Sequence, residues 1–257
     1  MSRQFPVVGE TQANPIAGIK AIKARGVLRV GYRPSNVPFS YYNNGGELVG
    51  FDVALATELA KDLGVKIEFI PFKRARFAEA LENGFFDVAM SGLIMSVDMM
   101  QEVNYSNPVL ELTRSLVVAD YRVKEFDSPE EIKAAKNITV AYVEDEALIK
   151  KARELLPNVT FEAVKNYKYF FKHKDGRYDA LLISAEAGSA WTLFYPDYGV
   201  AIFNRKAKYP SGYAVAWENT ELLRYVDNWI KLKAVDGTTD KAYDYWILGK
   251  QVKGDEK

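Results

Sequence analysis

The sequence predicts an α/β fold with two lobes, each a mainly parallel sheet flanked by helices. Short strand patterns alternate with amphipathic helix patterns along most of the chain, which is typical of sheets covered by helices on both faces. This alternation occurs in two successive blocks within 257 residues, a length sufficient for two domains. A composition with 48% hydrophobic residues supplies apolar side chains for two cores, and two lobes predict a ligand cleft between them.

Helix caps and a tight turn define the first block. Asn14-Pro15 is typical of a helix start, and Asp52 is expected to cap a helix that ends at Gly64. The glycine pair that follows Asn43-Asn44 predicts a hairpin turn. The elements expected in this block are a helix up to about residue 26, a strand at 27–32, a hairpin at 40–49, a helix at 52–63, a strand at 65–70, a helix at 77–81 and a strand at 86–90.

The second block repeats the alternation. Ser128 and Glu131 have the spacing of a capping box, and Asn219 is expected to cap a long amphipathic helix. The elements expected here are a helix after residue 128, a strand at 138–142, a helix at 146–155, a strand at 159–164, a helix near 167, strands at 178–183 and 213–217, and helices at 219–232 and 239–248.

Composition and motifs exclude several functional classes. The 34 basic and 34 acidic residues balance and no basic run occurs, so neither nucleic acid nor an anionic membrane surface is an expected partner. With no cysteine and one histidine, His173, the chain is unsuited to thiol chemistry, disulfides, a Ser-His-Asp triad or a transition-metal site. No glycine-rich phosphate-binding motif is present, so no cofactor is expected.

Several motifs give the chain a resemblance to a known family. They are Gly26-Val-Leu-Arg-Val-Gly, the run GELVGFDVALA from Gly46, LENGFFDV from Leu81, Gly176-Arg-Tyr-Asp-Ala and the ending DGTTDKAYDYW from Asp236. In this order and spacing, over roughly residues 20 to 250, they resemble the family 3 extracellular solute-binding proteins, the binding subunits of polar amino-acid ABC transporters.

The resemblance implies a type II periplasmic-binding-protein fold. Lobe 1 would comprise residues 1–115 and 211–257, and lobe 2 residues 116–210. Two crossing strands, one at Ser115–Ala119 and one near Pro210, would form a hinge that closes the lobes on a ligand.

The ligand-binding loop of lobe 1 departs from the family pattern. In relatives that bind α-amino acids, a Thr or Ser and an Arg hold the ligand carboxylate after the strand that here ends at Met90. Ser91 and Gly92 keep the start of that pattern, whereas Ile94 stands at the Thr/Ser position and Met99 at the Arg position. Both carboxylate-binding side chains are therefore missing, and Met99 is expected either to pack in the core or to line an apolar pocket wall.

The implied site in lobe 2 departs as well. The family's ammonium-binding Asp aligns with Ser184, with Glu186 two residues beyond. Glu144 and Asp145 replace a small Gly-Thr-Thr type of turn, where they would repel an anion or attract a cation or a polyhydroxylated ligand.

Three further residues are expected near the site. Arg74, next to Lys73, would either turn inward to bind an anion or remain solvated. Tyr41 would stack on a ligand or pack in the core. Asn36 stands where relatives often have an aromatic ligand lid.

The expected function is capture of a small solute, with altered specificity, for transport or sensing. The alternative is a cyclohexadienyl or arogenate dehydratase-like enzyme on the same scaffold, with Glu186 as general acid and Arg74 or Lys73 for substrate carboxylates. Expected partners are a small-molecule ligand and a transporter permease or fused membrane protein. The chain is expected to be monomeric and to work in the periplasm or outside the cell, after removal of an upstream signal peptide or membrane segment.

Overall fold

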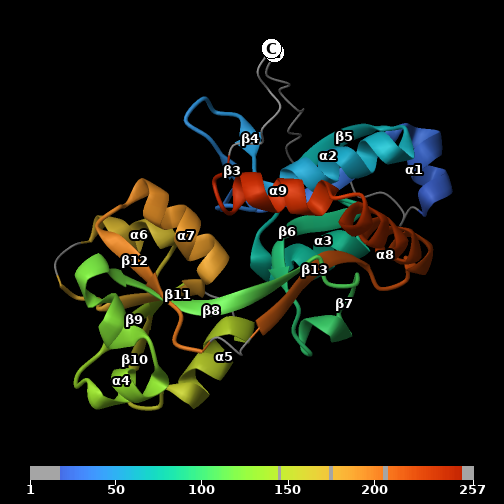
Figure 1. Cartoon of the computed structure of the whole chain (residues 1–257). Coiled ribbons are helices and arrows are strands. Elements are labelled where there is room, and N and C mark those ends of the chain that lie inside the picture. The colour runs from blue at the N-terminus through green and yellow to red at the C-terminus, as the bar shows by residue number, and fades with distance from the viewer. Residues whose placement is uncertain (1–17, 144–145, 174–175, 205–207, 251–257) are drawn as a thin grey trace, which may run out of the picture. The chain divides into compact units, whose positions relative to one another are not determined.

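The chain forms two compact units. The computed structural model describes residues 18–143, 146–173, 176–204 and 208–250. Unit 1 comprises Met1–Leu110 and Pro210–Lys257, and unit 2 comprises Glu111–Tyr209. The chain passes between the units twice, within strand β8 (Leu110–Ala119) and within strand β13 (Lys208–Ala216). Alternating strands and helices in both units confirm the predicted α/β class (Figure 1).

Unit 1 is built on a mixed sheet with the strand order β5-β1-β6-β13. The two parallel pairs join β1 to β5 and to β6, and β13 runs antiparallel to β6 and to β7. A small antiparallel sheet of β2, β3 and β4 contains the predicted hairpin. The bounds are β1 (Val27–Tyr32), β2 (Ser35–Asn36), β3 (Ser40–Tyr42), β4 (Leu48–Val49), β5 (Lys66–Pro71), β6 (Val88–Ile94) and β7 (Val103–Tyr105).

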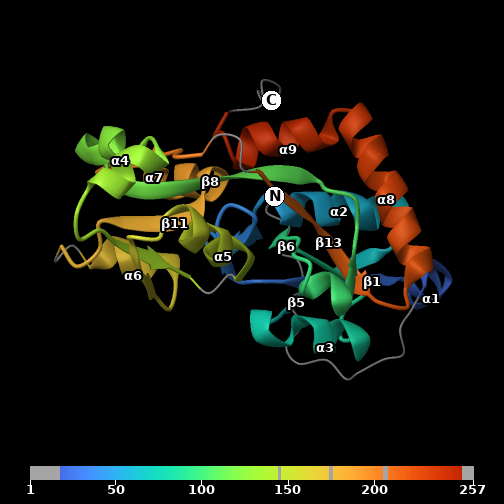
Figure 2. The same cartoon turned by 90° about the horizontal axis from the view of Figure 1, so that it is seen from below.

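Helices cover both faces of the unit 1 sheet. Figure 2 shows α2 and α9 on one side of the strands and α3 on the other. Buried side chains of α8 recur at helical spacing, at positions 222, 226, 229 and 230, which is the apolar stripe of an amphipathic helix. The bounds are α1 (Ile19–Arg25), α2 (Phe51–Leu63), α3 (Phe77–Glu82), α8 (Thr220–Val235) and α9 (Thr238–Trp246), with short 3-10 helices η1 (Arg74–Arg76) and η2 (Met99–Gln101).

In unit 2 the strands follow the order β10-β9-β11-β8, and β12 pairs with β8 as well. The first three strands are parallel, whereas β8 runs antiparallel to β11 and β12. Helices α5 and α7 lie on opposite sides of β8 (Figures 1 and 2). The bounds are β9 (Thr139–Tyr142), β10 (Thr160–Ala163), β11 (Ala180–Ser184), β12 (Tyr198–Ala201), η3 (Asp120–Phe126), α4 (Pro129–Ala134), α5 (Glu146–Leu155), α6 (Tyr167–Lys172) and α7 (Ala185–Phe194).

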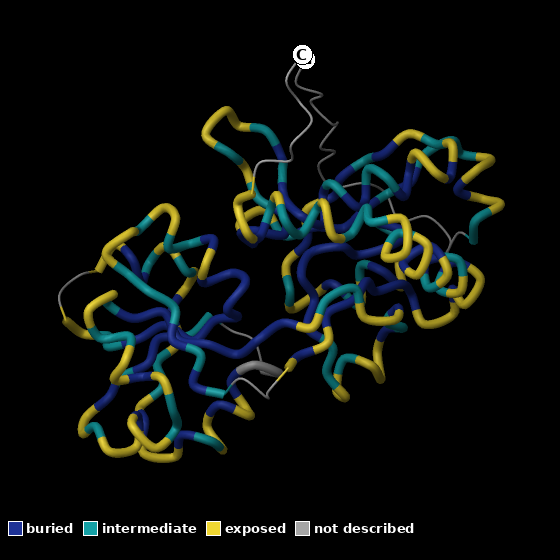
Figure 3. The backbone as a smooth tube through the Cα atoms, in the orientation of Figure 1, coloured by how far each residue is buried: buried dark blue, intermediate teal, exposed yellow. Residues whose placement is uncertain are grey.

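Buried strand residues contribute much of the core of each unit. Figure 3 shows most of β6, β8 and β11 in the colour of buried residues. Gly31 in β1 is obligatory, because a Cβ at this position would lie 2.5 Å from the ring of Phe86.

Two predicted helix caps are confirmed and one is wrong. The Ser128 hydroxyl accepts a hydrogen bond from Glu131 N, and the Asn219 side chain accepts one from Leu222 N. Asp52 does not cap α2, which begins at Phe51 after Gly50. Its side chain points into the protein and accepts a hydrogen bond from Gly92 N in β6. Asn14-Pro15 lies outside the described residues.

Candidate functional site

Strand β6 extends further than the sequence predicted. The strand was expected to end at Met90 and to be followed by a loop, but it continues to Ile94 because β13 pairs with it as far as Ser211. Ser91, Gly92 and Ile94 are therefore strand residues. Since β1 and β6 are parallel neighbours, the carboxyl ends of both strands meet at one edge, which is where open α/β sheets bind ligands.

A buried polar cluster surrounds Ser91 at this edge. The Ser91 hydroxyl accepts from Arg33 N at 3.0 Å and lies 2.7 Å from the hydroxyl of Ser40. The Ser91 carbonyl oxygen accepts from Asn36 Nδ2 at 2.7 Å and from Arg33 Nη2 at 3.0 Å. The structure thus brings together Asn36 and Ser91, two of the predicted site residues. Their polar groups bind each other and the backbone.

Gly92 is fixed by the same packing. Its φ of +55° is in the left-handed region, and a Cβ would lie 2.5 Å from the ring of Phe39. The Asp52 carboxyl group that binds Gly92 N is 2% exposed and lies beside the Tyr213 hydroxyl. Burial raises the pKa of Asp52 to about 7, although the hydrogen bond from Gly92, the neighbouring Tyr213 and the charge of Arg33 all oppose that shift.

Arg33 is a site residue that the sequence analysis missed. It follows β1 directly and places its guanidinium on the Ser91 carbonyl oxygen. A cation immediately after a predicted strand, at the edge where ligands bind, was the signal that could have identified it.

The two positions that depart from the family's carboxylate clamp are apolar in their packing as well. Ile94 is 6% exposed within β6. Met99 is half-buried at the start of η2 and packs against the apolar cluster that includes Phe72, Phe77 and Leu81. Neither position offers a hydroxyl or a cation to a ligand.

Tyr41 and Arg74 occupy half-buried positions in unit 1. Tyr41 in β3 packs edge-to-face on Trp246 of α9, with ring centroids 6.5 Å apart, and burial raises the pKa of its hydroxyl. Arg74 begins η1, after the carboxyl end of β5.

In unit 2, Ser184 and Glu186 lie at the junction of β11 and α7. Ser184 is the N-cap of α7, and its hydroxyl accepts from Ala187 N at 3.2 Å. Both carboxylate oxygens of Glu186 accept from Thr113 N, at 3.0 and 3.1 Å. Strand β11 ends opposite Arg114, so Thr113 N has no partner on that strand and Glu186 satisfies it. Glu144 and Asp145 lie outside the described residues.

Arg114 is the second site residue that the sequence analysis missed. It stands opposite Ser184 across the β8–β11 pair, with its guanidinium carbon 4.2 Å from the centre of the Tyr209 ring. The side chain is 1% exposed, and burial lowers its pKa to about 10, against the charge of Glu154. Glu111, Thr113 and Ser115 surround it in the sequence of β8, so no apolar pattern marked Arg114 as buried.

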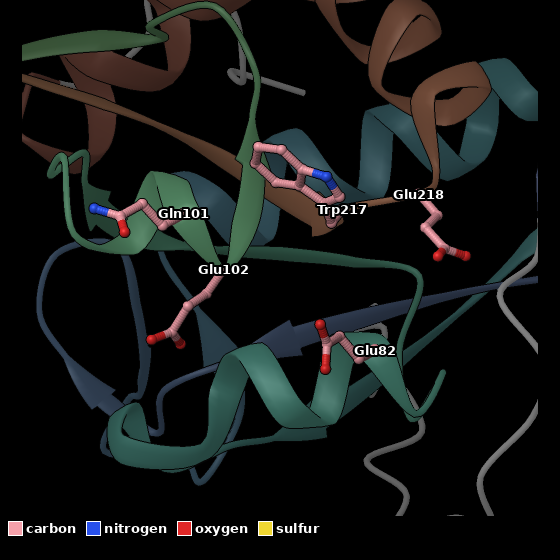
Figure 4. A pocket seen from close by; sticks show the side chains of 5 residues that line it. All are labelled: Glu82, Gln101, Glu102, Trp217 and Glu218. Atoms are coloured by element: carbon pink, nitrogen blue, oxygen red, sulfur yellow. The ribbon is translucent and has the colours of Figure 1, made fainter.

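Two surface hollows lie elsewhere on the units. One in unit 1 has a volume of about 440 Å³ and is lined by Glu82, Gln101, Glu102, Trp217 and Glu218, which come from α3, from the end of η2 and from the segment after β13 (Figure 4). One in unit 2 has a volume of about 670 Å³ and includes Arg122, His173 and Asp179 in its lining. None of the predicted ligand residues that the structure describes lines either hollow.

Two features are absent from the described residues. They contain no group of three or more histidine or acidic side chains placed to hold a metal ion. None of their helices combines the length and the apolar character that crossing a bilayer requires.

Comparisons with known proteins agree with the fold. The cyclohexadienyl dehydratase of Pseudomonas aeruginosa is 24% identical over 230 residues, 86% of this chain and 83% of that protein. The L-cystine-binding protein TcyJ of Escherichia coli is 26% identical over 236 residues, 89% of this chain and 85% of that protein. Among solved structures, an ancestral amino-acid-binding protein described as a precursor of cyclohexadienyl dehydratase is 31% identical. It covers 89% of this chain and 99% of its own, with a TM-score of 0.79.

The family model for bacterial extracellular solute-binding proteins of family 3 matches residues 28–249. The predicted type II binding-protein fold is confirmed by structural neighbours such as this ancestral protein. Because the match extends over most of both units, the chain belongs to the bacterial extracellular solute-binding proteins, family 3.

Proposed function

We propose that this chain captures a small solute for a membrane transporter or a sensor, and that the solute is not an α-amino acid held in the family's usual pose. Family membership supports solute capture outside the cytoplasmic membrane. The altered specificity rests on one observation: buried Ile94 and core-packed Met99 occupy the positions of the two side chains that would bind the ligand carboxylate.

Free energies indicate how large this effect is. A hydrogen bond to a charged group contributes about 1.5–3 kcal/mol, and each 1.4 kcal/mol changes a dissociation constant tenfold. Losing the hydroxyl and the cation together therefore lowers the affinity for an amino-acid carboxylate in that pose by at least about a hundredfold. Ser184 adds to this, because its hydroxyl caps α7 and it carries no charge for an ammonium group.

A solute screen tests the proposal. Amino acids, polyamines, carboxylates and sugars are added to the purified chain, and the melting temperature and the heat of binding are measured. Ordinary L-amino acids are expected to give little shift, whereas a solute of another class raises the melting temperature by linkage. Tight binding of glutamine, arginine or histidine contradicts the altered specificity, and a chain that binds no small molecule contradicts solute capture.

The second candidate is a dehydratase, which the similarity to cyclohexadienyl dehydratase favours. Glu186 is the general acid proposed for it, but both of its oxygens accept the Thr113 N–H, so the carboxyl group already serves to satisfy the backbone of β8. Prephenate and arogenate are therefore included in the screen, with turnover followed by ultraviolet absorbance. No turnover is expected, and turnover that disappears in Glu186→Gln would establish the enzyme instead.

A further inference from the structure

Arg114 is a buried cation whose hydrogen bonds are incomplete. Its Nε and Nη1 atoms are inaccessible to solvent and have no hydrogen-bond partner among the described residues. Other arginines of unit 2 do have partners: Arg122 pairs with Asp179 and Glu125, and Arg177 pairs with Glu162. A buried guanidinium without an anion is unfavourable, because water no longer solvates its charge.

A second polar group beside Arg114 is also unsatisfied. The Tyr209 ring packs on the guanidinium, and the Tyr209 hydroxyl is buried without a partner in the same described part of the chain. The two side chains come from β8 and β13, and together they present three buried polar atoms at one place in unit 2. Buried polar groups nearly always have a hydrogen-bond partner, so this cluster needs an explanation, and a bound polar ligand would supply one.

The position of the cluster in the sheet agrees with a ligand site. Arg114 pairs with Ser184 at the carboxyl end of β11. The neighbouring parallel strand β9 ends at Tyr142, which pairs with Leu182 of β11. This is the edge of the unit 2 sheet where an α/β fold binds its ligand. Arg114 lies three residues before Val117, whose side chain faces Gly188 of α7, so Arg114 lies on the other face, the side of α5.

The neighbouring polar groups at this edge each have a partner of their own. Lys208 Nζ donates to the Thr113 hydroxyl at 2.6 Å, and Glu186 binds Thr113 N. Glu154 on α5 acts on Arg114 through its charge but is half-exposed and ion-paired with Lys151. Arg114 and Tyr209, in contrast, have buried polar atoms with no hydrogen-bond partner among the described residues.

From this arrangement we infer that Arg114 and Tyr209 bind a carboxylate group of the solute, and so supply in unit 2 the anion site that Ile94 and Met99 cannot form. The inference rests on the proposed function. A carboxylate carries one charge, which one guanidinium neutralises, and its oxygens accept from both the guanidinium and the phenol. The negative charge of Glu154, which acts on Arg114, disfavours a doubly charged phosphate.

Carboxylates with matched amides test the inference. Sodium acetate, succinate and benzoate are compared with acetamide, succinamide and benzamide, and with sodium chloride and phosphate at equal ionic strength. At least one carboxylate is expected to raise the melting temperature and to shift the Arg114 Nε–H resonance, whereas its amide does neither. Arg114→Met is expected to lower the affinity for that carboxylate by about 10- to 100-fold, which is the range for one hydrogen bond to a charged group.

Stability separates ligand binding from a structural role. Because no described group pairs with Arg114 Nε and Nη1, Arg114→Met is expected to keep or raise the melting temperature of the ligand-free chain. Tyr209→Phe keeps the ring, so it is expected to fold normally and to bind the carboxylate several-fold more weakly. The control is Arg122→Met, which breaks the ion pairs with Asp179 and Glu125 and is expected to lower stability while leaving carboxylate affinity unchanged.

The contrary outcomes distinguish this inference from the proposed function. Full carboxylate affinity in both Arg114→Met and Tyr209→Phe overturns the inference, as does a response to phosphate alone. A neutral or cationic solute that binds while every carboxylate fails overturns the inference and leaves solute capture intact. A chain that binds none of the solutes in the wider screen refutes both.

Discussion

Among single side chains, three buried polar residues differ most clearly in their hydrogen bonding and charge. Asp52, Ser91 and Arg114 are each at most 2% exposed, and each has a different electrostatic situation. Ser91 is satisfied by backbone and side-chain partners, Asp52 is a carboxyl group with a raised pKa, and Arg114 has two donors without partners. Ser91 therefore has a structural role, whereas Asp52 couples the stability of unit 1 to pH.

Asp52 is expected to make stability fall as pH rises. Its folded-state pKa of about 7 lies above the ordinary value of 3.8, so the folded chain takes up a proton that the unfolded chain does not hold between these values. The contribution of the group is therefore complete below about pH 4 and is lost as pH rises through 7, by a few kcal/mol at most. The free energy of unfolding, measured in urea from pH 4 to 8, should show this slope in the wild type and a weaker one in Asp52→Asn.

Asp62 provides a control of opposite sign. Its carboxylate accepts from Lys233 Nζ and Trp229 Nε1, both at 2.8 Å, and the hydrogen bond to Lys233 is the main cause that lowers its pKa. Its contribution is therefore present at neutral pH and lost in acid, so the advantage of the wild type over Asp62→Asn should shrink as pH falls. Equal pH slopes for the wild type and Asp52→Asn would contradict the raised pKa of Asp52.

At the scale of elements, local chemistry sets where helices begin, and pairing sets where strands end. Asn219 and Ser128 satisfy backbone N–H groups in the first turns of α8 and α4. Strand β6, in contrast, continues past its expected end because β13 supplies hydrogen bonds to Leu93 and Ile94. Helix starts can therefore be tested by changing one side chain.

The Asn219 cap is expected to stabilise the chain measurably. α8 spans Thr220–Val235, and Asn219 Oδ1 accepts from Leu222 N at 3.3 Å. Asn219→Ala removes this acceptor and should lower the free energy of unfolding by about 1 kcal/mol, whereas Asn219→Asp keeps an acceptor and should restore most of it. Urea unfolding followed by circular dichroism measures both. An alanine variant as stable as the wild type would show that the cap contributes nothing.

At the scale of the whole molecule, the two units have separate cores, and the chain runs from one to the other within β8 and β13. Unit 2 is one continuous segment, whereas unit 1 contains both ends of the chain. A solute that binds only the folded chain stabilises, by linkage, each unit that must be folded for binding.

The tryptophans allow each unit to be followed separately. Three of the four, Trp217, Trp229 and Trp246, lie in unit 1, and Trp191 is in unit 2, where it stacks on Phe171. The fluorescence of Trp191→Phe reports unit 1, and the difference from the wild type reports unit 2. A solute found in the screen is expected to raise the melting temperatures of both transitions. At a solute concentration a hundred times its dissociation constant, the added stability is about 2.7 kcal/mol. A shift confined to one unit would place the whole ligand site in that unit.

The candidate site was only partly predictable. Motif order led to Asn36, Ser91, Gly92 and Ser184, because a shared family pattern marks those positions. Arg33 and Arg114 were missed, since a lone arginine in a strand region looks the same in sequence whether its guanidinium is solvated or buried. Only the packing of Ser91 on Arg33 and of Tyr209 on Arg114 distinguishes these cases.

The α/β class, the order of the elements, the Ser128 and Asn219 caps and the family could all be predicted from the sequence. All of these depend on interactions between residues close in the chain, or on motifs that can be compared directly. Tertiary structure alone decided that Asp52 binds β6 instead of capping α2, that β6 extends to Ile94, and that Glu186 is held by Thr113 N. The partners in these three cases are 40, 117 and 73 residues apart, and periodicity within one segment carries no information about groups that folding brings together over such separations.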